Sequence, residues 1–125
     1  MANTSAELVF IPAPGVGHMI STIHMAKALV NRHQSLSVTT LLINPPGSSA
    51  GTYIESLAKN PIGRIRFIQL PQDQTQPKLD PKNFLTSLYE IINSYRKHVR
   101  NIVADMINQT GPGRVVGFVV DVFCM

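Results

Sequence analysis

The sequence predicts an α/β fold in which one parallel sheet is covered by helices on both faces, and three observations indicate this class. Four short, nearly continuous apolar segments alternate with segments of helical periodicity, which is the pattern of buried parallel strands joined by helices. Proline closely follows each of the first three apolar segments, as expected where a strand ends. Only 14% of the residues are charged, which indicates either strands covered on both faces or a surface covered by a missing partner.

The first two strands and the first helix are predicted near the amino terminus. Residues 8–11 form a short apolar run that Pro12 ends. A loop rich in proline and glycine follows at 13–17, and residues 19–32 carry apolar side chains at near-helical spacing. Residues 36–43 are apolar and rich in β-branched side chains, so we expect a second buried strand there.

A short helix and a third strand come next in the chain. Thr52 and Glu55 have the spacing of a capping box, which predicts a helix over about 53–59. Residues 65–70 again have the pattern of a buried strand. The polar segment 71–81 contains several prolines and is long for a connection in a compact α/β unit, which is typical of a functional loop.

A long helix and a fourth strand complete the pattern. Asp80 is an expected N-cap residue, with Pro81 at the first helical position. A single apolar stripe then runs along about six helical turns, and Asn93 and Ser94 are the residues at which the helix could bend. The stripe comprises Leu85, Leu88, Ile92, Tyr95, Val99, Ile102 and Met106. Residues 115–120 form the fourth apolar run.

The order of these elements predicts a Rossmann-like sheet. Right-handed crossovers between parallel strands lead to the spatial order 3-2-1-4. The chain ends five residues after the fourth predicted strand, without a helix to cover that strand. We therefore expect residues 1–125 to be part of a larger domain.

Composition and charge argue against several classes of function. The net charge is +4, but the basic residues are dispersed, apart from Arg96, Lys97 and Arg100, and the chain has no Trp. We therefore expect no nucleic-acid partner. The single cysteine, Cys124, allows no internal disulfide and fits a reducing compartment. The polar start lacks the positive segment of a secretory signal, and no apolar run approaches the length of a membrane helix, so we expect a cytoplasmic protein without a membrane span.

Two titratable residues are predicted to meet where such sheets bind ligands. That place is the switch point beyond the carboxyl ends of the first and fourth strands. His18 follows the first strand and Asp121 follows the fourth, so we expect a general base with an orienting carboxylate. The positive end of the helix dipole disfavours a charged imidazole at His18, whereas the carboxylate stabilises the proton once it is taken. Gly15 and Gly17 let the backbone approach a ligand closely.

Simpler interpretations of the titratable residues remain open. A histidine at a helix start is often a polar surface or capping residue, and an aspartate after a strand often forms a cap or a turn. We expect His24 to be structural, and His33 and His98 to be solvated. No cluster of His, Asp or Glu has the spacing of metal ligands, so no metal site is expected.

The motifs of nucleotide-binding loops are incomplete in this sequence. Gly15 and Gly17 supply two glycines of the dinucleotide fingerprint, but Ile20 stands at the third position. No acidic residue follows the second strand to bind a ribose, and no P-loop sequence occurs. We therefore do not expect hydride transfer with a nicotinamide cofactor.

The segment LVFIPAPGVGH, residues 8–18, resembles the opening of plant UDP-sugar-dependent glycosyltransferases. These enzymes belong to glycosyltransferase family 1 and have the two-domain GT-B fold. Segments 26–29, 43–46 and 116–124 are also similar, so the resemblance extends over essentially the whole chain. The plant enzymes that act on phenolic small molecules such as flavonoids are the most similar group. The resemblance implies an incomplete N-terminal domain of a GT-B fold.

The resemblance also implies roles for individual residues. His18 matches the histidine that binds and deprotonates the acceptor hydroxyl, and Asp121 matches the aspartate that pairs with it. The acceptor oxygen then attacks the anomeric carbon of a UDP-sugar with inversion, so the UDP-sugar is a co-substrate and neither a cofactor nor a metal is implied. Val16 and Phe123 fall where the family contacts the acceptor, and Gly17 falls where it contacts the donor sugar. A place in the hydrophobic core is an equal alternative for Phe123.

The chain departs from the family in one large respect. The family holds the UDP-sugar mainly in a second domain, through a box rich in Trp, His, Gly, Asn and Gln, and this chain has no such box. We expect residues 1–125 to be a truncated acceptor-binding domain that is inactive without its C-terminal, UDP-sugar-binding domain. The whole protein is then an enzyme that transfers a sugar, glucose in the first place, to a hydroxyl of a small plant-type acceptor. The alternative is a non-catalytic truncated product or a small-molecule binding module.

Overall fold

The computed structural model describes residues 6–13, 15–44, 51–70, 80–110 and 115–120, and it has the predicted α/β architecture. The strands are β1 (Ala6–Ile11), β2 (Leu36–Leu42), β3 (Ile65–Gln69) and β4 (Val115–Val120). The helices are α1 (Val16–Arg32), α2 (Gly51–Lys59), α3 (Phe84–Ser94) and α4 (Arg96–Thr110), with a 3-10 turn, η1 (Pro81–Asn83), before α3.

The four strands form one parallel sheet in the order β3-β2-β1-β4, as predicted. The register aligns Phe10 with Val119 and Ile11 with Val120. The carboxyl ends of β1 and β4 therefore lie side by side, although their sequences are about a hundred residues apart. The switch point that the sequence predicts is thus present in the sheet.

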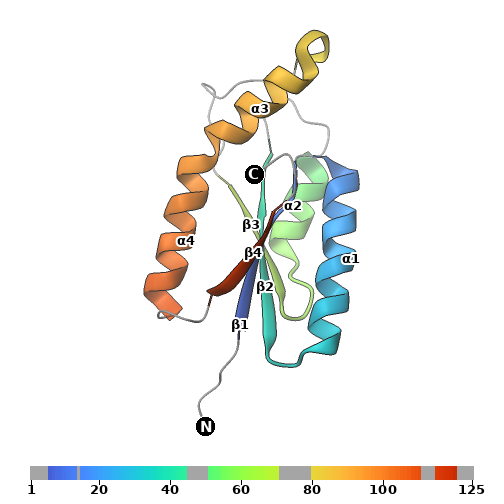
Figure 1. Ribbon diagram of the computed structural model, residues 1–125. Helices are drawn as coiled ribbons and strands as arrows, with labels where there is room; N and C mark the ends of the chain where they lie inside the picture. Colours follow the sequence, from blue (N-terminus) through green and yellow to red (C-terminus); the bar gives the residue numbers. More distant parts are fainter. Residues whose placement is uncertain (1–5, 14, 45–50, 71–79, 111–114, 121–125) are drawn as a thin grey trace.

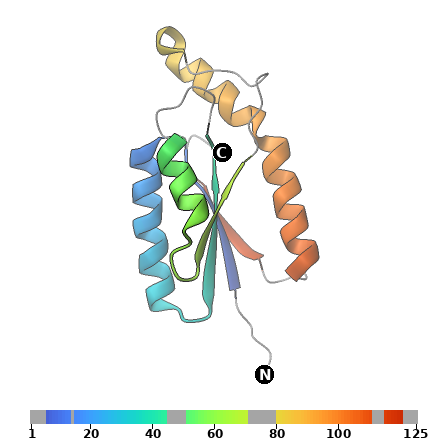
Figure 2. The same cartoon turned by 180° about the vertical axis from the view of Figure 1, so that it is seen from behind.

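Hydrophobic clusters cover both faces of the sheet. In Figure 1, α1 and α2 lie on one side of the strands and α4 lies on the other, and Figure 2 shows the same layers from behind. The fully buried members on the side of α1 and α2 are Phe10, Met19, Ala26, Val38, Leu42, Ile54 and Ile65. Those on the side of α4 are Val9, Leu41, Ile43, Leu70, Ile91 and Tyr95. Alternate residues of each strand supply the two clusters, which is why the strands read as continuous apolar runs.

The predicted long helical region is divided into α3 and α4 at Tyr95, directly after Asn93 and Ser94, the residues at which a bend was expected. The Tyr95 ring is fully buried, and its hydroxyl donates a hydrogen bond of 3.0 Å to the main-chain carbonyl of Asn44 at the end of β2. Above this anchor α3 leans away from α4 across the carboxyl end of the sheet (Figure 1). Leu85, predicted as part of the buried stripe, is 68% exposed, whereas Ile91 is fully buried.

Two helix starts also differ from the prediction, and one agrees with it. Helix α1 begins at Val16, three residues earlier than predicted, so His18 lies inside its first turn. Helix α2 begins at Gly51, so Thr52 lies within the helix rather than before it, and the predicted capping box is wrong. Asp80 does cap the next turn, because its Oδ1 accepts a hydrogen bond of 3.0 Å from the backbone N–H of Lys82.

The side chain of Arg64 connects the loop before β3 to the end of α1. Its guanidinium donates to four main-chain carbonyls, at Nη···O distances of 3.0 Å for His33 and 2.9 Å for Leu36, and also to Gln34 and Val30. The last carbonyls of a helix lack partners within the helix and carry partial negative charge. A forked cation satisfies several of them at once, so Arg64 fixes the turn between α1 and β2.

A candidate acceptor site at the start of α1

A glycine begins helix α1 because its backbone conformation requires one. Gly15, the N-cap residue, has φ 131° and ψ 140°, which a residue with a side chain adopts only with strain. Its carbonyl accepts the first helical hydrogen bond from the N–H of Met19, at 3.1 Å. A Cβ atom built on Gly15 would lie 3.6 Å from Cδ2 of His18. Because Gly15 has no side chain, only its backbone lies next to the imidazole of His18.

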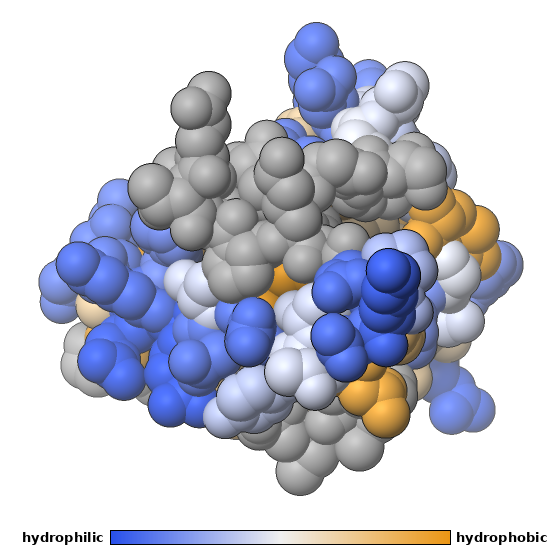
Figure 3. Space-filling view, turned by 90° about the horizontal axis from the view of Figure 1, so that it is seen from above, coloured by the Kyte–Doolittle hydropathy of each residue, from blue (hydrophilic) through white to orange (hydrophobic). Residues whose placement is uncertain are grey.

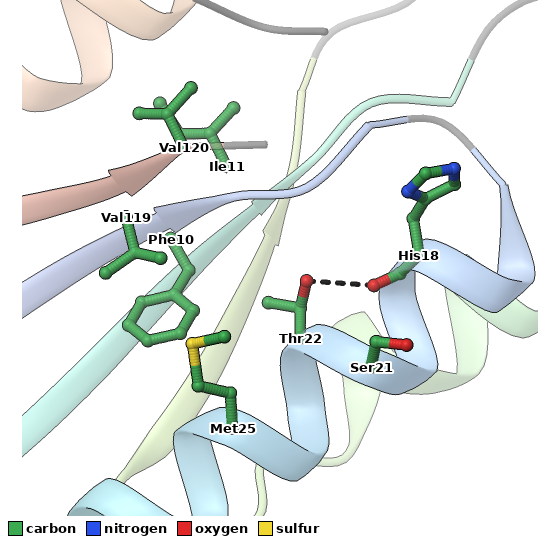
Figure 4. A pocket seen from close by; sticks show the side chains of 8 residues that line it. All are labelled: Phe10, Ile11, His18, Ser21, Thr22, Met25, Val119 and Val120. Atoms are coloured by element: carbon green, nitrogen blue, oxygen red, sulfur yellow. Dashed lines mark hydrogen bonds between the residues drawn. The ribbon is translucent and has the colours of Figure 1, made fainter. Parts of the chain in front are cut away.

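His18 is exposed in the first turn of α1, where it was expected at or just before that turn. One turn later, Thr22 donates a hydrogen bond of 2.8 Å from its hydroxyl to the main-chain carbonyl of His18 (Figure 4). Such a bond back to residue i−4 occupies the threonine hydroxyl within its own helix. Val16 and Gly17 are also exposed in this turn, and Val16 is 37% exposed.

A hollow of about 190 Å³ lies between α1 and the ends of β1 and β4. Its lining residues are Phe10, Ile11, His18, Ser21, Thr22, Met25, Val119 and Val120. Figure 4 shows the imidazole of His18 at one end of the hollow, with Phe10 and Met25 together at the other. Among the described residues that line the hollow, those from the strands are apolar, and the polar ones come from α1.

The structure describes only some of the predicted site residues. Val16, Gly17 and His18 lie together at the start of α1, and His18 lines the hollow. Asp121 and Phe123 fall outside the described residues. Val120, the residue before Asp121 in the sequence, lines the same hollow as His18.

Sequence reasoning missed three residues of α1 that line the hollow, namely Ser21, Thr22 and Met25. They stand three, four and seven residues after His18, which is the spacing of one helix face. This spacing could have indicated them, but the direction of that face depends on how α1 packs on the sheet.

The other histidines lie away from this hollow. His24 and His33 are exposed, in agreement with the expected solvation of His33. His98 is partly exposed on α4, and its ring lies 6.1 Å from that of buried Tyr95 in a tilted arrangement. Within the described ranges, no three His, Cys, Asp or Glu residues form a group that could hold a metal ion.

Charged residues gather on the helix that covers the opposite face. Arg96, Lys97 and Arg100, the one cluster of basic residues in the sequence, are exposed on α4. Seen from above the carboxyl ends of the strands, hydrophilic side chains dominate the side of the molecule on which α4 lies (Figure 3). In the part of the chain that the structure describes, no helix combines the length and the apolar character that crossing a bilayer demands.

Known plant glycosyltransferases are similar to this chain in sequence. No protein-family model matches the chain. A strawberry (Fragaria ananassa) protein, UDP-glucose flavonoid 3-O-glucosyltransferase 6, is 37% identical over 126 residues, which is 96% of this chain and 25% of that protein. A pear (Pyrus communis) protein, UDP-glycosyltransferase 71K2, is 37% identical over 95% of this chain and 26% of its own length.

Solved structures agree with the sequence relatives. The Medicago truncatula UGT71G1 complex with UDP-glucose matches 98% of this chain and 26% of its own, with a TM-score of 0.74 and 32% identity. A transferase from Siraitia grosvenorii in complex with UDP matches 95% of this chain and 24% of its own, with a TM-score of 0.69 and 33% identity. The chain therefore spans about a quarter of the length of these relatives, and in both sequence and fold it corresponds to the N-terminal part of the plant UDP-glycosyltransferase family.

Proposed function

We propose that this chain is the acceptor-binding part of an inverting UDP-glycosyltransferase. The reaction transfers a sugar, glucose in the first place, from a UDP-sugar to a hydroxyl group of a small plant-type acceptor such as a flavonoid or another phenolic. The observation that carries this proposal is the exposed imidazole of His18 at the sheet's switch point, beside a hollow with apolar walls. The strawberry relative is a UDP-glucose flavonoid 3-O-glucosyltransferase and the Medicago relative binds UDP-glucose, which supports the same reaction.

The proposed chemistry requires one base and one leaving group. A ring nitrogen of His18 takes the proton of the acceptor hydroxyl as the oxygen bonds to the anomeric carbon of the sugar. The bond between that carbon and the phosphate oxygen breaks on the opposite side, and UDP leaves with the electron pair. The anomeric configuration is inverted, and no covalent intermediate with the protein is formed. Positive charge develops on the sugar ring in the transition state, as in glycoside hydrolysis.

Asp121 is proposed as the partner of His18. Its carboxylate orients the imidazole and stabilises the imidazolium that forms when the proton is taken. Support comes from the register, because Val120 pairs with Ile11 and both line the hollow that contains His18. Val16 and Phe123 are proposed as acceptor contacts, and Gly17 as a contact to the donor sugar.

The donor site is proposed to lie in a C-terminal domain that this chain does not include. The relatives carry about three quarters of their length beyond the matched part. We therefore expect residues 1–125 to show negligible transferase activity by themselves, and we expect the complete protein to be cytoplasmic.

A chimera tests the proposed base. Residues 1–125 replace the matching quarter of the strawberry relative, and turnover is measured with UDP-glucose and a poorly acidic alcohol as acceptor. His18→Ala should lower turnover by about 10²–10⁴-fold, the range for a general base. An acidic phenol should lose much less, because it ionises without help. His24→Ala, on the same helix and also exposed, is the matched control and should leave turnover unchanged.

Two outcomes would contradict the proposal. If the folded His18→Ala chimera keeps near-normal turnover with the poorly acidic alcohol, His18 is not the base. If Asp121→Asn unfolds the protein rather than reducing turnover, the carboxylate has a structural role. Circular dichroism of each variant separates loss of folding from loss of chemistry.

A further inference from the structure

A row of polar side chains crosses three strands of the sheet, at the end away from the candidate site. At its centre is Thr39 of β2, which is fully buried. The Thr39 hydroxyl donates a hydrogen bond of 2.5 Å to Oε2 of Glu7 on β1 and accepts one of 2.8 Å from Nε of Arg66 on β3. Through one hydroxyl, these three residues, the polar row, therefore link β1, β2 and β3.

The polar row lies on the side of the sheet that α4 covers. Side chains on one face of a strand repeat every two residues. Each member of the row stands two residues before an apolar side chain of the cluster on the α4 side, namely Val9, Leu41 and Ile68. The row is thus the polar border of an otherwise apolar layer.

The charges in the polar row follow a fixed order. Arg66 is exposed and supplies a cation, whereas Glu7 is 6% exposed and supplies a carboxylate within the sheet. A cation that donates to the Thr39 hydroxyl polarises it and makes it a stronger donor to the carboxylate. Because a buried carboxylate that loses hydrogen bonds is strongly destabilised, the row favours one arrangement of the three strands.

The apolar side chains of these strands discriminate poorly between registers. A shift of one strand by two residues keeps every side chain on its own face. On the side of α1 and α2, for example, Leu8 pairs with Val38. A shift of β1 by two residues would bring Phe10 opposite Val38, which is again a pair of apolar side chains. Burial of apolar surface therefore changes little between the two registers.

The polar row does discriminate between these registers. A shift of two residues moves Glu7 by about 6.6 Å along β2, which is beyond the reach of a hydrogen bond to the Thr39 hydroxyl. The same shift would move the end of β1, where Ile11 pairs with Val120, and with it the start of α1 that carries His18. The height of β1 in the sheet therefore sets the place of His18 relative to β4.

We propose that the polar row fixes the register of β1, β2 and β3, and that Thr39 is its central positioning residue. Polar groups buried in an apolar layer can determine which arrangement forms without adding net stability. In this chain the row holds β1 at one height, and so holds the helix start with His18 at one place. This inference concerns how the strands are aligned and does not depend on the proposed function.

Nuclear Overhauser effects between strands measure the register directly in the isotope-labelled 125-residue chain. In the original chain they should connect Val9 with Thr39 and Phe10 with Thr40, the residues that are paired in register. Thr39→Val removes the hydroxyl with little change of shape. It should give a second set of amide signals in β1 and β2, with contacts displaced by two residues. Thr39→Ser keeps a hydroxyl and should restore the single set.

Thr40→Val is the matched control, because it makes the same chemical change at the next residue of β2. Thr40 is also buried, but its hydroxyl has no hydrogen-bond partner among the residues described. This variant should keep one register. A triple variant, Glu7→Leu with Thr39→Val and Arg66→Met, removes the whole row. It should remain folded by circular dichroism and show mixed registers, since no member of the row is left without its partners.

The inference is overturned if Thr39→Val and the triple variant both keep the single original register, or if Thr40→Val mixes registers as much as Thr39→Val. If Thr39→Val does not fold, the triple variant decides alone. Loss of folding in both would also overturn the inference, because the row would then support stability rather than register. The His18→Ala chimera tests the proposed base separately.

Discussion

Removing the guanidinium of Arg64 should destabilise the whole chain, although the side chain is exposed and far along the sheet from the candidate site. Arg64→Ala removes hydrogen bonds to four main-chain carbonyls at the junction of α1 and β2. The bonds to Val30 and Leu36 are partly buried, whereas those to His33 and Gln34 are exposed. The partly buried pair should therefore account for most of the effect.

The expected size follows from these contacts. A hydrogen bond from a charged donor contributes about 1.5–3 kcal/mol, and partial exposure reduces this figure to about half for the pair at Val30 and Leu36. The lost cation near the carboxyl end of α1 adds about 0.3–1 kcal/mol. The free energy of unfolding should therefore fall by about 2–4 kcal/mol, out of the roughly 5–15 kcal/mol typical of a domain.

Urea unfolding followed by circular dichroism measures this loss. With the slope of about 1–3 kcal/mol per molar that small proteins show, the midpoint should fall by about 0.7–4 M. Arg64→Lys keeps the charge but not the fork, so its midpoint should lie between those of Arg64→Ala and the original chain. Arg100→Ala, an exposed arginine on α4, is the matched control and should change stability by less than about 0.5 kcal/mol. Equal midpoints for Arg64→Ala and Arg100→Ala would refute the reasoning.

Two further substitutions should change stability in opposite directions in the same urea assay. The Thr40 hydroxyl is buried and has no hydrogen-bond partner among the residues described, and Thr40 pairs in register with Phe10 and Phe67. Thr40→Val should raise the free energy of unfolding by about 1 kcal/mol, because a methyl group of similar size replaces a desolvated hydroxyl; a lower midpoint would contradict this. Tyr95→Phe should lower it by about 1–2 kcal/mol, because the buried bond to the Asn44 carbonyl is lost. An unchanged midpoint would mean that the Tyr95 hydroxyl does not hold the bend between α3 and α4.

The strands could be predicted closely because each is a local feature of the sequence. The fourth strand was expected at residues 115–120 and lies at Val115–Val120, and the other three agree to within about two residues at either end. Strands buried on both faces are apolar throughout, so β1, β2 and β3 can be found without knowledge of their neighbours. The expected burial of the fourth strand is wrong, because none of its residues is fully buried and Val116 and Phe118 are 57% and 51% exposed. The order of the strands also followed, because right-handed crossovers leave few alternatives.

The long helical region could not be predicted as well, because its bend depends on a distant contact. The apolar spacing continues through Tyr95 and favours one long helix, and only Asn93 and Ser94 indicate where it could bend. The break is held by a hydrogen bond from Tyr95 to Asn44, fifty-one residues away in the sequence. On the amino-terminal side of this break, α3 extends away from the sheet. Leu85 is therefore exposed, although it belongs to the apolar stripe.

The sequence by itself determined the class of fold, the order of the strands and the position of His18 at the first helix start. These depend on runs of apolar residues, on proline and glycine, and on the limited number of ways in which parallel strands connect. Only the tertiary structure decided which side of α1 faces β4, and so which residues join His18 around the hollow. The reason is physical: a helix with apolar residues on much of its surface can be rotated in several ways, and packing against the sheet selects one of them.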